Sequence, residues 1–153
     1  MPRGNGERVK RSGPIYDIDD TQLEKTLKKR KRILIIDDDE LVVDSLTILL
    51  KKHHYHIETA LNGFEALELL DEETFDLVMA DIKMPGINGV ETVRALRETG
   101  RLAGNREIPV VFMTGYTDHD LEKQAKKSKY LAFLYKPFDD TQILQILKKQ
   151  LGA

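Results

Sequence analysis

A chain of 153 residues is long enough to bury the core of a single domain without metal or disulfide staples. The absence of cysteine excludes thiol nucleophiles, cysteine-based metal sites and a disulfide framework, and no apolar run approaches the length of a membrane span. This composition permits a cytoplasmic protein, which is the location we expect.

The first part of the chain is basic and the rest is acidic, although the net charge is only −2. Residues 1–32 carry ten Lys or Arg against five Asp or Glu, and residues 33–153 carry fourteen against twenty-one. We predict that residues 1–31 form a basic, largely disordered extension. Within it, Asp20 or Thr21 would cap a short helix from Gln22 to about Arg32. We interpret the basic run 28–32 as a solvated leader and expect no nucleic acid partner.

From Arg32 onward, short apolar runs alternate with segments of helical periodicity. The apolar runs are typical of buried parallel strands and cover residues 33–36, 57–60, 77–80, 109–113 and 131–135. Helices are predicted at about 41–52, 64–70, 90–98 and 118–128, with a last one from Asp139 or Asp140 to Leu151. The fourth of these helices is the weakest prediction, because it has only Leu121 and Ala125 to bury.

Five β-α units of this kind predict one α/β domain, residues 32–153, with a doubly wound, five-stranded parallel sheet and helices on both faces. The carboxyl ends of parallel strands share one edge of the sheet, so the polar residues that follow the strands meet there. At that edge the sequence places Asp37, Asp38 and Asp39 after the first strand, Asp81 after the third, Thr114 after the fourth and Lys136 after the fifth.

Carboxylates gathered at one edge repel each other, by about 4 kcal/mol for two charges about 4 Å apart at an effective dielectric of about 20. A hard divalent ion offsets this repulsion, and oxygen ligands without His or Cys suit Mg²⁺, which binds through one or two carboxylates plus phosphate. The edge therefore favours a phosphoryl group. Thr114 and Lys136 can donate hydrogen bonds to its oxygens, and Asp81 is the natural nucleophile for an acyl phosphate.

The order of these residues resembles the receiver domain of two-component response regulators. The resemblance covers about Arg32 to Leu151 and implies a (βα)5 flavodoxin-like fold and a phosphoprotein of a phosphorelay. It rests on four motifs, each at its expected strand end: Asp37-Asp38, Asp81-x-x-Met84-Pro85-Gly86, Thr114, and Lys136-Pro137-Phe138.

The resemblance also implies roles for single residues. Asp81 would accept a phosphoryl group from a histidine kinase or a histidine phosphotransfer protein. Asp38 and Asp81 would bind Mg²⁺ directly and Asp37 through water, with the backbone carbonyl of Lys83 completing the protein ligands.

Two further residues would carry the signal away from the acceptor. Thr114 would move to a phosphoryl oxygen, which also pairs with Lys136, and Phe133 matches the switch aromatic that turns inward on activation. The Lys136–Pro137 bond would be cis. An output protein would bind the face formed by the fourth helix, the fifth strand and the fifth helix. No output domain follows Leu151, so we expect a stand-alone receiver whose output comes through a partner, or else a piece of a longer protein.

The chain departs from the family pattern near the acceptor. Lys83 and Tyr116, two residues after Asp81 and Thr114, are a cation and a bulky aromatic that would shield a phosphoryl group from water, so we predict slow autodephosphorylation. The run 126–129 (Lys-Lys-Ser-Lys) replaces a small Gly/Ala-rich turn, which predicts a shorter or displaced fourth helix.

The alternative function is a Mg²⁺-dependent phosphatase or phosphotransferase with an aspartyl-phosphate intermediate. Such enzymes usually carry a second carboxylate two residues after the nucleophile, and Lys83 occupies that position. We therefore expect no enzyme beyond catalysis of the chain's own phosphorylation and dephosphorylation. His53, His54 and His56 straddle a helix end and a strand start, and we interpret them as a solvated turn rather than a metal site.

Overall fold

The computed structural model describes residues 19–23, 30–98, 108–115 and 119–152. The chain divides into two compact units, Met1–Arg30 and Lys31–Ala153. In the first unit residues 20–23 are helical, and the side chain of Asp19 caps them by accepting a hydrogen bond from the backbone N–H of Gln22 at 2.8 Å. Residues 1–18 and 24–29, with most of the predicted disordered extension and the first two residues of the basic run, lie outside the described residues.

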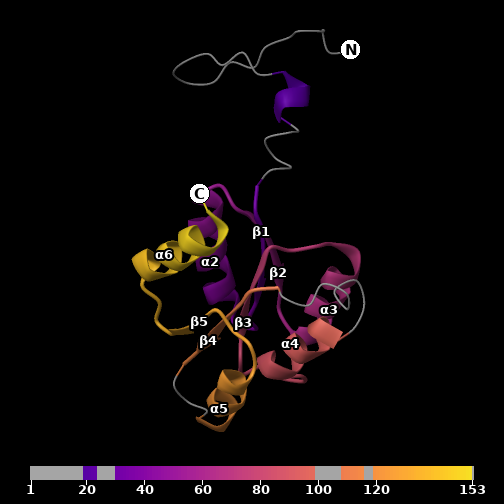
Figure 1. The fold of residues 1–153 in the computed structure, drawn as a ribbon, viewed down its shortest axis with the longest axis vertical. Helices are drawn as coiled ribbons and strands as arrows, with labels where there is room; N and C mark the ends of the chain where they lie inside the picture. The colour runs from indigo at the N-terminus through magenta and orange to yellow at the C-terminus, as the bar shows by residue number, and fades with distance from the viewer. Residues whose placement is uncertain (1–18, 24–29, 99–107, 116–118, 153) are drawn as a thin grey trace. The chain divides into compact units, whose positions relative to one another are not determined.

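The second unit is built on a five-stranded parallel sheet of order β2-β1-β3-β4-β5 (Figure 1). This order confirms the predicted doubly wound fold. Strands β3 and β4 are buried along their whole length, as their largely apolar sequences require. The strands are β1 Arg32–Ile36, β2 His56–Ala60, β3 Leu77–Asp81, β4 Val110–Thr114 and β5 Ala132–Tyr135.

Five helices of this unit cover the two faces of the sheet (Figure 1). Two separate clusters of buried side chains show the division: α2 and α6 pack on one face, and α3, α4 and α5 on the other. Among the residues that the structure describes, no helix is long and apolar enough to span a membrane. The bounds are α2 Glu40–Lys52, α3 Gly63–Glu72, α4 Gly89–Glu98, α5 His119–Lys127 and α6 Asp140–Leu151.

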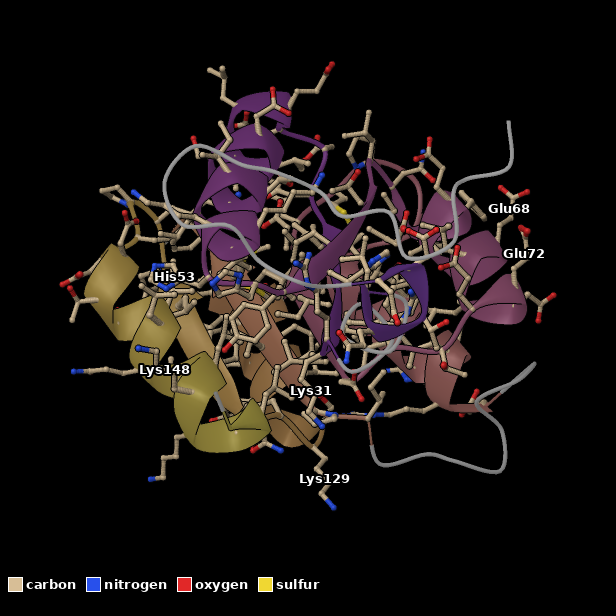
Figure 2. The ribbon with its side chains drawn as sticks, turned by 90° about the horizontal axis from the view of Figure 1, so that it is seen from above. Lys31, His53, Glu68, Glu72, Lys129 and Lys148 are labelled. Atoms are coloured by element: carbon tan, nitrogen blue, oxygen red, sulfur yellow. The ribbon has the colours of Figure 1, made fainter. Side chains whose placement is uncertain are left out.

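Charged side chains point away from the sheet. Figure 2 shows Glu68 and Glu72 of α3 on one side of the unit, with Lys148 of α6 and Lys129 on another. All four residues are exposed, which leaves the apolar stripes of α3 and α6 for the sheet.

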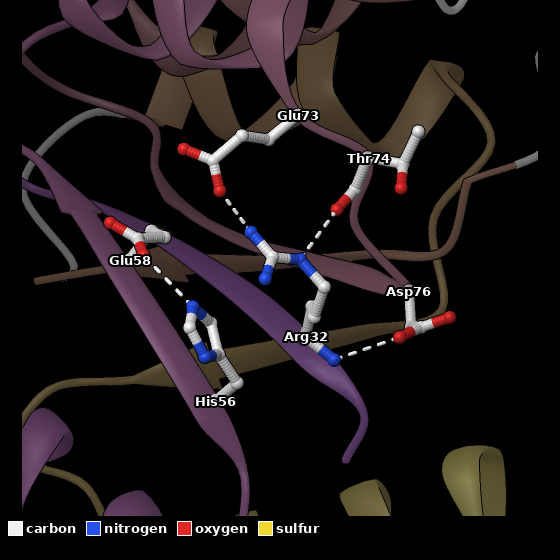
Figure 3. Close-up of polar contacts among 6 residues, drawn as sticks. All are labelled: Arg32, His56, Glu58, Glu73, Thr74 and Asp76. Atoms are coloured by element: carbon white, nitrogen blue, oxygen red, sulfur yellow. Dashed lines mark hydrogen bonds and ion pairs between the residues drawn. The ribbon is translucent and has the colours of Figure 1, made fainter. Parts of the chain in front are cut away.

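One sequence prediction was wrong. The short helix was expected to continue to about Arg32, but Arg32 is the first residue of β1, and the preceding Arg30 lies in a bend. Arg32 instead joins a polar network at the amino edge of the sheet (Figure 3). Its backbone N–H donates to Asp76 Oδ2 at 2.7 Å, its Nε donates to the Thr74 carbonyl at 3.0 Å, and its Nη2 pairs with Glu73.

The same network contains His56, whose Nε2 lies 2.8 Å from Glu58 Oε2 (Figure 3). Ligand-type atoms of His56, Glu58 and Glu73 lie within 4.8 Å of one another, the spacing of a metal site. However, the guanidinium of Arg32 already supplies the positive charge that Glu73 faces. We therefore interpret the ion pair and the two hydrogen bonds of Arg32 as contacts that fasten the start of β1 to the segment before β3.

An Arg32→Met variant should lose about 1–2 kcal/mol of unfolding free energy, because it removes the guanidinium contacts and keeps an unbranched apolar stem. Urea unfolding measures this loss. Lys31→Met is the matched control, since it removes a neighbouring exposed cation. Equal stability of the two variants would contradict the fastening role.

Candidate functional site

The carboxyl ends of four strands bring the predicted site residues to one edge of the sheet. Asp81 is the last residue of β3 and Thr114 the last of β4, while Asp37 and Lys136 directly follow β1 and β5. Asp37, Asp81 and Thr114 are at most 5% exposed. Carboxylates as buried as those of Asp37 and Asp81 need a charged or hydrogen-bonding partner. Asp38 is exposed at the rim.

Lys136 is the partner of the two buried carboxylates. Its Nζ lies 2.8 Å from Asp37 Oδ2 and 3.6 Å from Asp81 Oδ2. Its backbone N–H donates to the Thr114 carbonyl at 2.8 Å, which fixes the start of the segment after β5 against β4. The following Lys136–Pro137 bond is cis, as predicted.

The electrostatics of the edge leave Asp81 unusually basic. Burial is the main cause that raises the pKa of Asp81 to about 7, and the nearby charge of Asp37 adds to it, while Lys136 and the backbone N–H of Lys83 act in the opposite direction. Burial alone would lower the pKa of Lys136, but its contacts with Asp37 and Asp81 outweigh burial and raise it. Lys136 therefore stays charged at neutral pH, but it compensates the negative charge of ionised Asp81 only in part.

The donor set fits a hard divalent ion. Carboxylate oxygens of Asp37, Asp38 and Asp81 lie within 4.8 Å of one another. Among the described residues, buried Asp37 Oδ2 receives no hydrogen bond of good geometry and is met only by the Lys136 ammonium. Oxygen ligands, high negative charge and an exposed third carboxylate are the features by which proteins bind Mg²⁺.

The loops after β1 and β3 are held by their own hydrogen bonds. Asp37 Oδ1 accepts from the backbone N–H of Asp39 at 3.0 Å, and Asp39 in turn caps α2 through the N–H of Leu41. After β3, the N–H of Gly89 donates to the Ile82 carbonyl at 3.0 Å. A Cβ on Gly89 would lie 2.1 Å from the Asp81 carbonyl oxygen, so only glycine allows α4 to start this close to the acceptor.

Phe133 does not lie at this edge. It is half-buried in β5 and pairs in register with Phe112, whereas the register partner of Thr114 is Tyr135. The structure thus brings together Asp37, Asp38, Asp81, Thr114 and Lys136, and it places the side chain of Lys83 in solvent beside them. Tyr116 lies outside the described residues.

The sequence prediction missed an exposed apolar rim around the acidic edge. Leu41, in the first turn of α2, is 78% exposed, and Phe64, in the first turn of α3, is 59% exposed. Beside Leu41, a groove of about 270 Å³ runs between α2 and α6 and ends at Lys136. The sequence pattern placed Leu41 and Phe64 on the apolar faces of their predicted helices, so it gave no signal of their exposure.

A doubly wound sheet of this order with an acidic carboxyl edge defines a CheY-like α/β protein. Residues 33–148 match the response regulator receiver domain family, and the chain belongs to this family. Receiver domains of this family interact with histidine kinases or phosphotransfer proteins and are not enzymes in the usual sense.

The chain matches most of the length of one relative and only a small part of another. The chain is 33% identical over 97 residues to sporulation initiation phosphotransferase F of Bacillus subtilis, a match that spans 63% of this chain and 74% of that protein. It is 37% identical over 98 residues to the transcriptional regulatory protein ZraR of Klebsiella oxytoca, a match that spans 64% of this chain but only 21% of that protein.

Solved structures show the same fold. The chemotaxis protein CheY4 of Vibrio cholerae superposes with a TM-score of 0.71 at 27% identity, over 80% of this chain and 99% of that one. The receiver domain of the sensor histidine kinase PA1611 of Pseudomonas aeruginosa, which has a magnesium ion coordinated in its active site cleft, superposes with a TM-score of 0.71. It is 18% identical over 81% of this chain and 99% of that one, so it shows the fold alone.

Proposed function

We propose that residues 32–153 form a phosphoacceptor receiver domain of a two-component regulatory system. Asp81 accepts a phosphoryl group from a histidine kinase or a histidine phosphotransfer protein in a Mg²⁺-dependent reaction, and the product changes partner binding. The observation that supports this most strongly is the set of three carboxylates within 4.8 Å of one another, with Lys136 Nζ placed 2.8 and 3.6 Å from two of them.

In this proposal Asp37, Asp38, Asp81 and the backbone carbonyl of Lys83 hold Mg²⁺. When bound, the ion neutralises charge on the carboxylates and on the phosphoryl oxygens. A carboxylate oxygen of Asp81 forms the new bond to phosphorus while the bond from phosphorus to the donor's imidazole nitrogen breaks, and the leaving imidazole takes up a proton.

The remaining side chains of the edge position the phosphoryl group. The ammonium of Lys136 is 3.6 Å from Asp81 and can pair with a phosphoryl oxygen, and the Thr114 hydroxyl can donate a hydrogen bond to another. These contacts exist only in the phosphorylated protein, so they shift the population between two conformations.

The surroundings of the edge suit a protein as the phosphoryl donor. The apolar rim of Leu41 and Phe64 and the groove that ends at Lys136 offer apolar area that a small phosphorylated molecule would not cover. We further propose that the output protein binds the face formed by α5, β5 and α6, and that the protein acts in the cytoplasm.

The test is incubation of the protein with phosphoramidate and Mg²⁺, followed by intact mass spectrometry. We expect one phosphoryl adduct, stable in acid and labile in base, which is absent in Asp81→Asn and absent when EDTA replaces Mg²⁺. Asp39→Asn is the matched control, because asparagine still caps α2, and it should keep the adduct. An adduct of undiminished yield in Asp81→Asn would contradict the proposal.

The same reaction distinguishes a receiver domain from the alternative function, a Mg²⁺-dependent phosphatase or phosphotransferase. A phosphatase or phosphotransferase releases phosphate over many turnovers, whereas a receiver keeps its phosphoryl group. With Lys83 where such an enzyme would carry its acid-base carboxylate, we expect release no faster than the decay of the adduct.

We predict that the phosphoryl group on Asp81 decays over minutes or longer. Lys83 stands beside the acceptor with its side chain free to lie over the phosphoryl oxygens, and it offers no carboxylate to activate water. Lys83→Ala should shorten the half-life several-fold, and Lys123→Ala, an exposed lysine of α5, should leave it unchanged. A wild-type half-life of seconds in Mg²⁺ would contradict the prediction.

A further inference from the structure

Helix α5 is fastened to the sheet by very little apolar area. Of its nine residues only Ala125 is buried, and Leu121 is half-buried. Burial of so little apolar surface contributes little stability, so other contacts must hold this helix in place.

Those contacts come from two charged residues one helical turn apart. Lys126 Nζ lies 5.4 Å from the centre of the Phe133 ring, a distance at which a cation is attracted by the ring face. The phenol of Tyr135 lies close to Glu122, whose carboxylate is the main cause that raises the pKa of Tyr135, while Lys126 acts in the opposite direction. We refer to Glu122, Lys126, Phe133 and Tyr135 as the α5 clasp.

The geometry of both elements favours this pairing. Residues four apart lie on the same face of a helix, and residues two apart lie on the same face of a strand. Glu122 and Lys126 therefore meet Phe133 and Tyr135 together, while Leu134, between the two aromatics, points into the opposite core.

The Phe133 ring, which Lys126 contacts, lies at the centre of an aromatic cluster. Phe133 packs edge-on against Tyr130 with centroids 5.2 Å apart, and its centroid is 5.6 Å from that of Phe112. Tyr135, the other clasped residue, is the register partner of Thr114 at the acidic edge. A change at Thr114 thus reaches the clasp through one pair of neighbouring strand residues.

We propose that Lys126 and Glu122 are positioning residues that hold α5 and the Phe133 ring in the conformation of the unphosphorylated protein, and that phosphorylation weakens this hold. The second half rests on the proposed function, and the first half does not. Release of α5 would then change the face offered to an output protein.

The first half is tested on the unphosphorylated protein by hydrogen exchange of the α5 amides. Lys126→Met removes the cation and keeps the stem, and it should speed exchange about three-fold, the effect of losing one exposed cation–ring contact. Lys126→Arg should restore the wild-type rate, because arginine also binds ring faces. Lys127→Met, one residue along the same helix, is the control and should match wild type.

Tyr135→Phe removes the phenol hydroxyl that lies close to Glu122, and by this independent route it should also speed exchange in α5. Equal exchange in Lys126→Met, Tyr135→Phe and Lys127→Met would overturn the clasp. If the α5 amides of Lys126→Arg exchanged as fast as those of Lys126→Met, the role of the cation would be overturned.

The second half is tested by repeating the exchange after phosphorylation with phosphoramidate and Mg²⁺. We expect α5 exchange in the wild type to rise toward that of Lys126→Met, with little further rise in the variant itself. An adduct confirmed by intact mass with unchanged α5 exchange would overturn the switching half. Failure to form any adduct would overturn the proposed function instead, and the unphosphorylated comparison would still decide the clasp.

Discussion

A Gly89→Ala variant should lose about 3 kcal/mol of unfolding free energy, near the upper end for a single added methyl group. The added Cβ would lie 2.1 Å from the Asp81 carbonyl oxygen, 2.9 Å from its carbonyl carbon and 2.9 Å from Ile82 Cα. All three are backbone atoms, so no side-chain rotation relieves the clash, and α4 or the end of β3 must move.

Urea unfolding measures the loss, and Gly115→Ala is the matched control. No described atom lies within 4 Å of a Cβ on Gly115, so this substitution should change stability by less than about 0.5 kcal/mol. Because the clash falls on Asp81 itself, Gly89→Ala should also slow phosphorylation by phosphoramidate. Equal stability of the two alanine variants would show that α4 does not start as close to the acceptor as described.

An Asp81→Asn variant should be more stable than the wild type at pH 8 without divalent ions, by about 2 kcal/mol. The folded protein raises the pKa of Asp81 from 3.8 to about 7 through burial and the charge of Asp37. A raised pKa means that the folded state resists ionisation of this carboxyl. Asparagine removes that cost and keeps the shape of the side chain.

The sign of the effect follows from proton binding. Between about pH 4 and pH 7 the unfolded chain has lost the Asp81 proton and the folded protein retains it, so wild-type stability falls as pH rises through this window. The shift of roughly three pKa units corresponds to at most about 4 kcal/mol. We expect less, because water at the open edge screens these charges.

Urea unfolding from pH 4 to pH 8 in EDTA should therefore show the two proteins converging near pH 4 and separating above it. Asp44→Asn, an exposed carboxylate of α2, is the control and should follow the wild type. Added Mg²⁺ should stabilise the wild type more than Asp81→Asn, because the ion takes over the uncompensated charge. A constant difference at every pH would contradict this interpretation.

The sheet was predictable because its strands carry short, continuous apolar runs. The five predicted runs agree with the five strands to within one residue at each end, and all five helices predicted for the second unit are present, including the weakly apolar α5. The edge was predictable for a topological reason, since parallel strands bring every residue at their carboxyl ends together.

Helix starts were less well predicted, although part of the signal was present. Asn88 and Glu91 exchange hydrogen bonds at 2.8 and 2.9 Å before α4. Before α3, the side chain of Asn62 accepts from the N–H of Glu65 at 2.9 Å, and the side chain of Glu65 accepts from the N–H of Leu61 at 3.0 Å. An Asn three residues before a Glu at the start of an apolar helical pattern is a readable capping signal. This signal places the starts of α3 and α4 at Gly63 and Gly89, each directly after its Asn.

Other features depend on contacts between distant residues. Arg32 and Glu73 are 41 residues apart. Their ion pair, which helps to hold Arg32 at the start of β1, therefore leaves no local pattern in the sequence. The α5 clasp is similar: Lys126 stood out only as part of a departure from the family's usual turn. Its contact with Phe133 depends on how α5 lies on β5.

The most direct test of the central claim is to locate the phosphoryl group. Reduction of the phosphorylated protein with borohydride converts the acyl-phosphate aspartate to homoserine, which peptide mass spectrometry assigns to one position. We expect homoserine at position 81 alone, and none in protein treated without Mg²⁺. Homoserine at position 37 or 38 with aspartate retained at 81 would contradict the assignment of Asp81 as the acceptor.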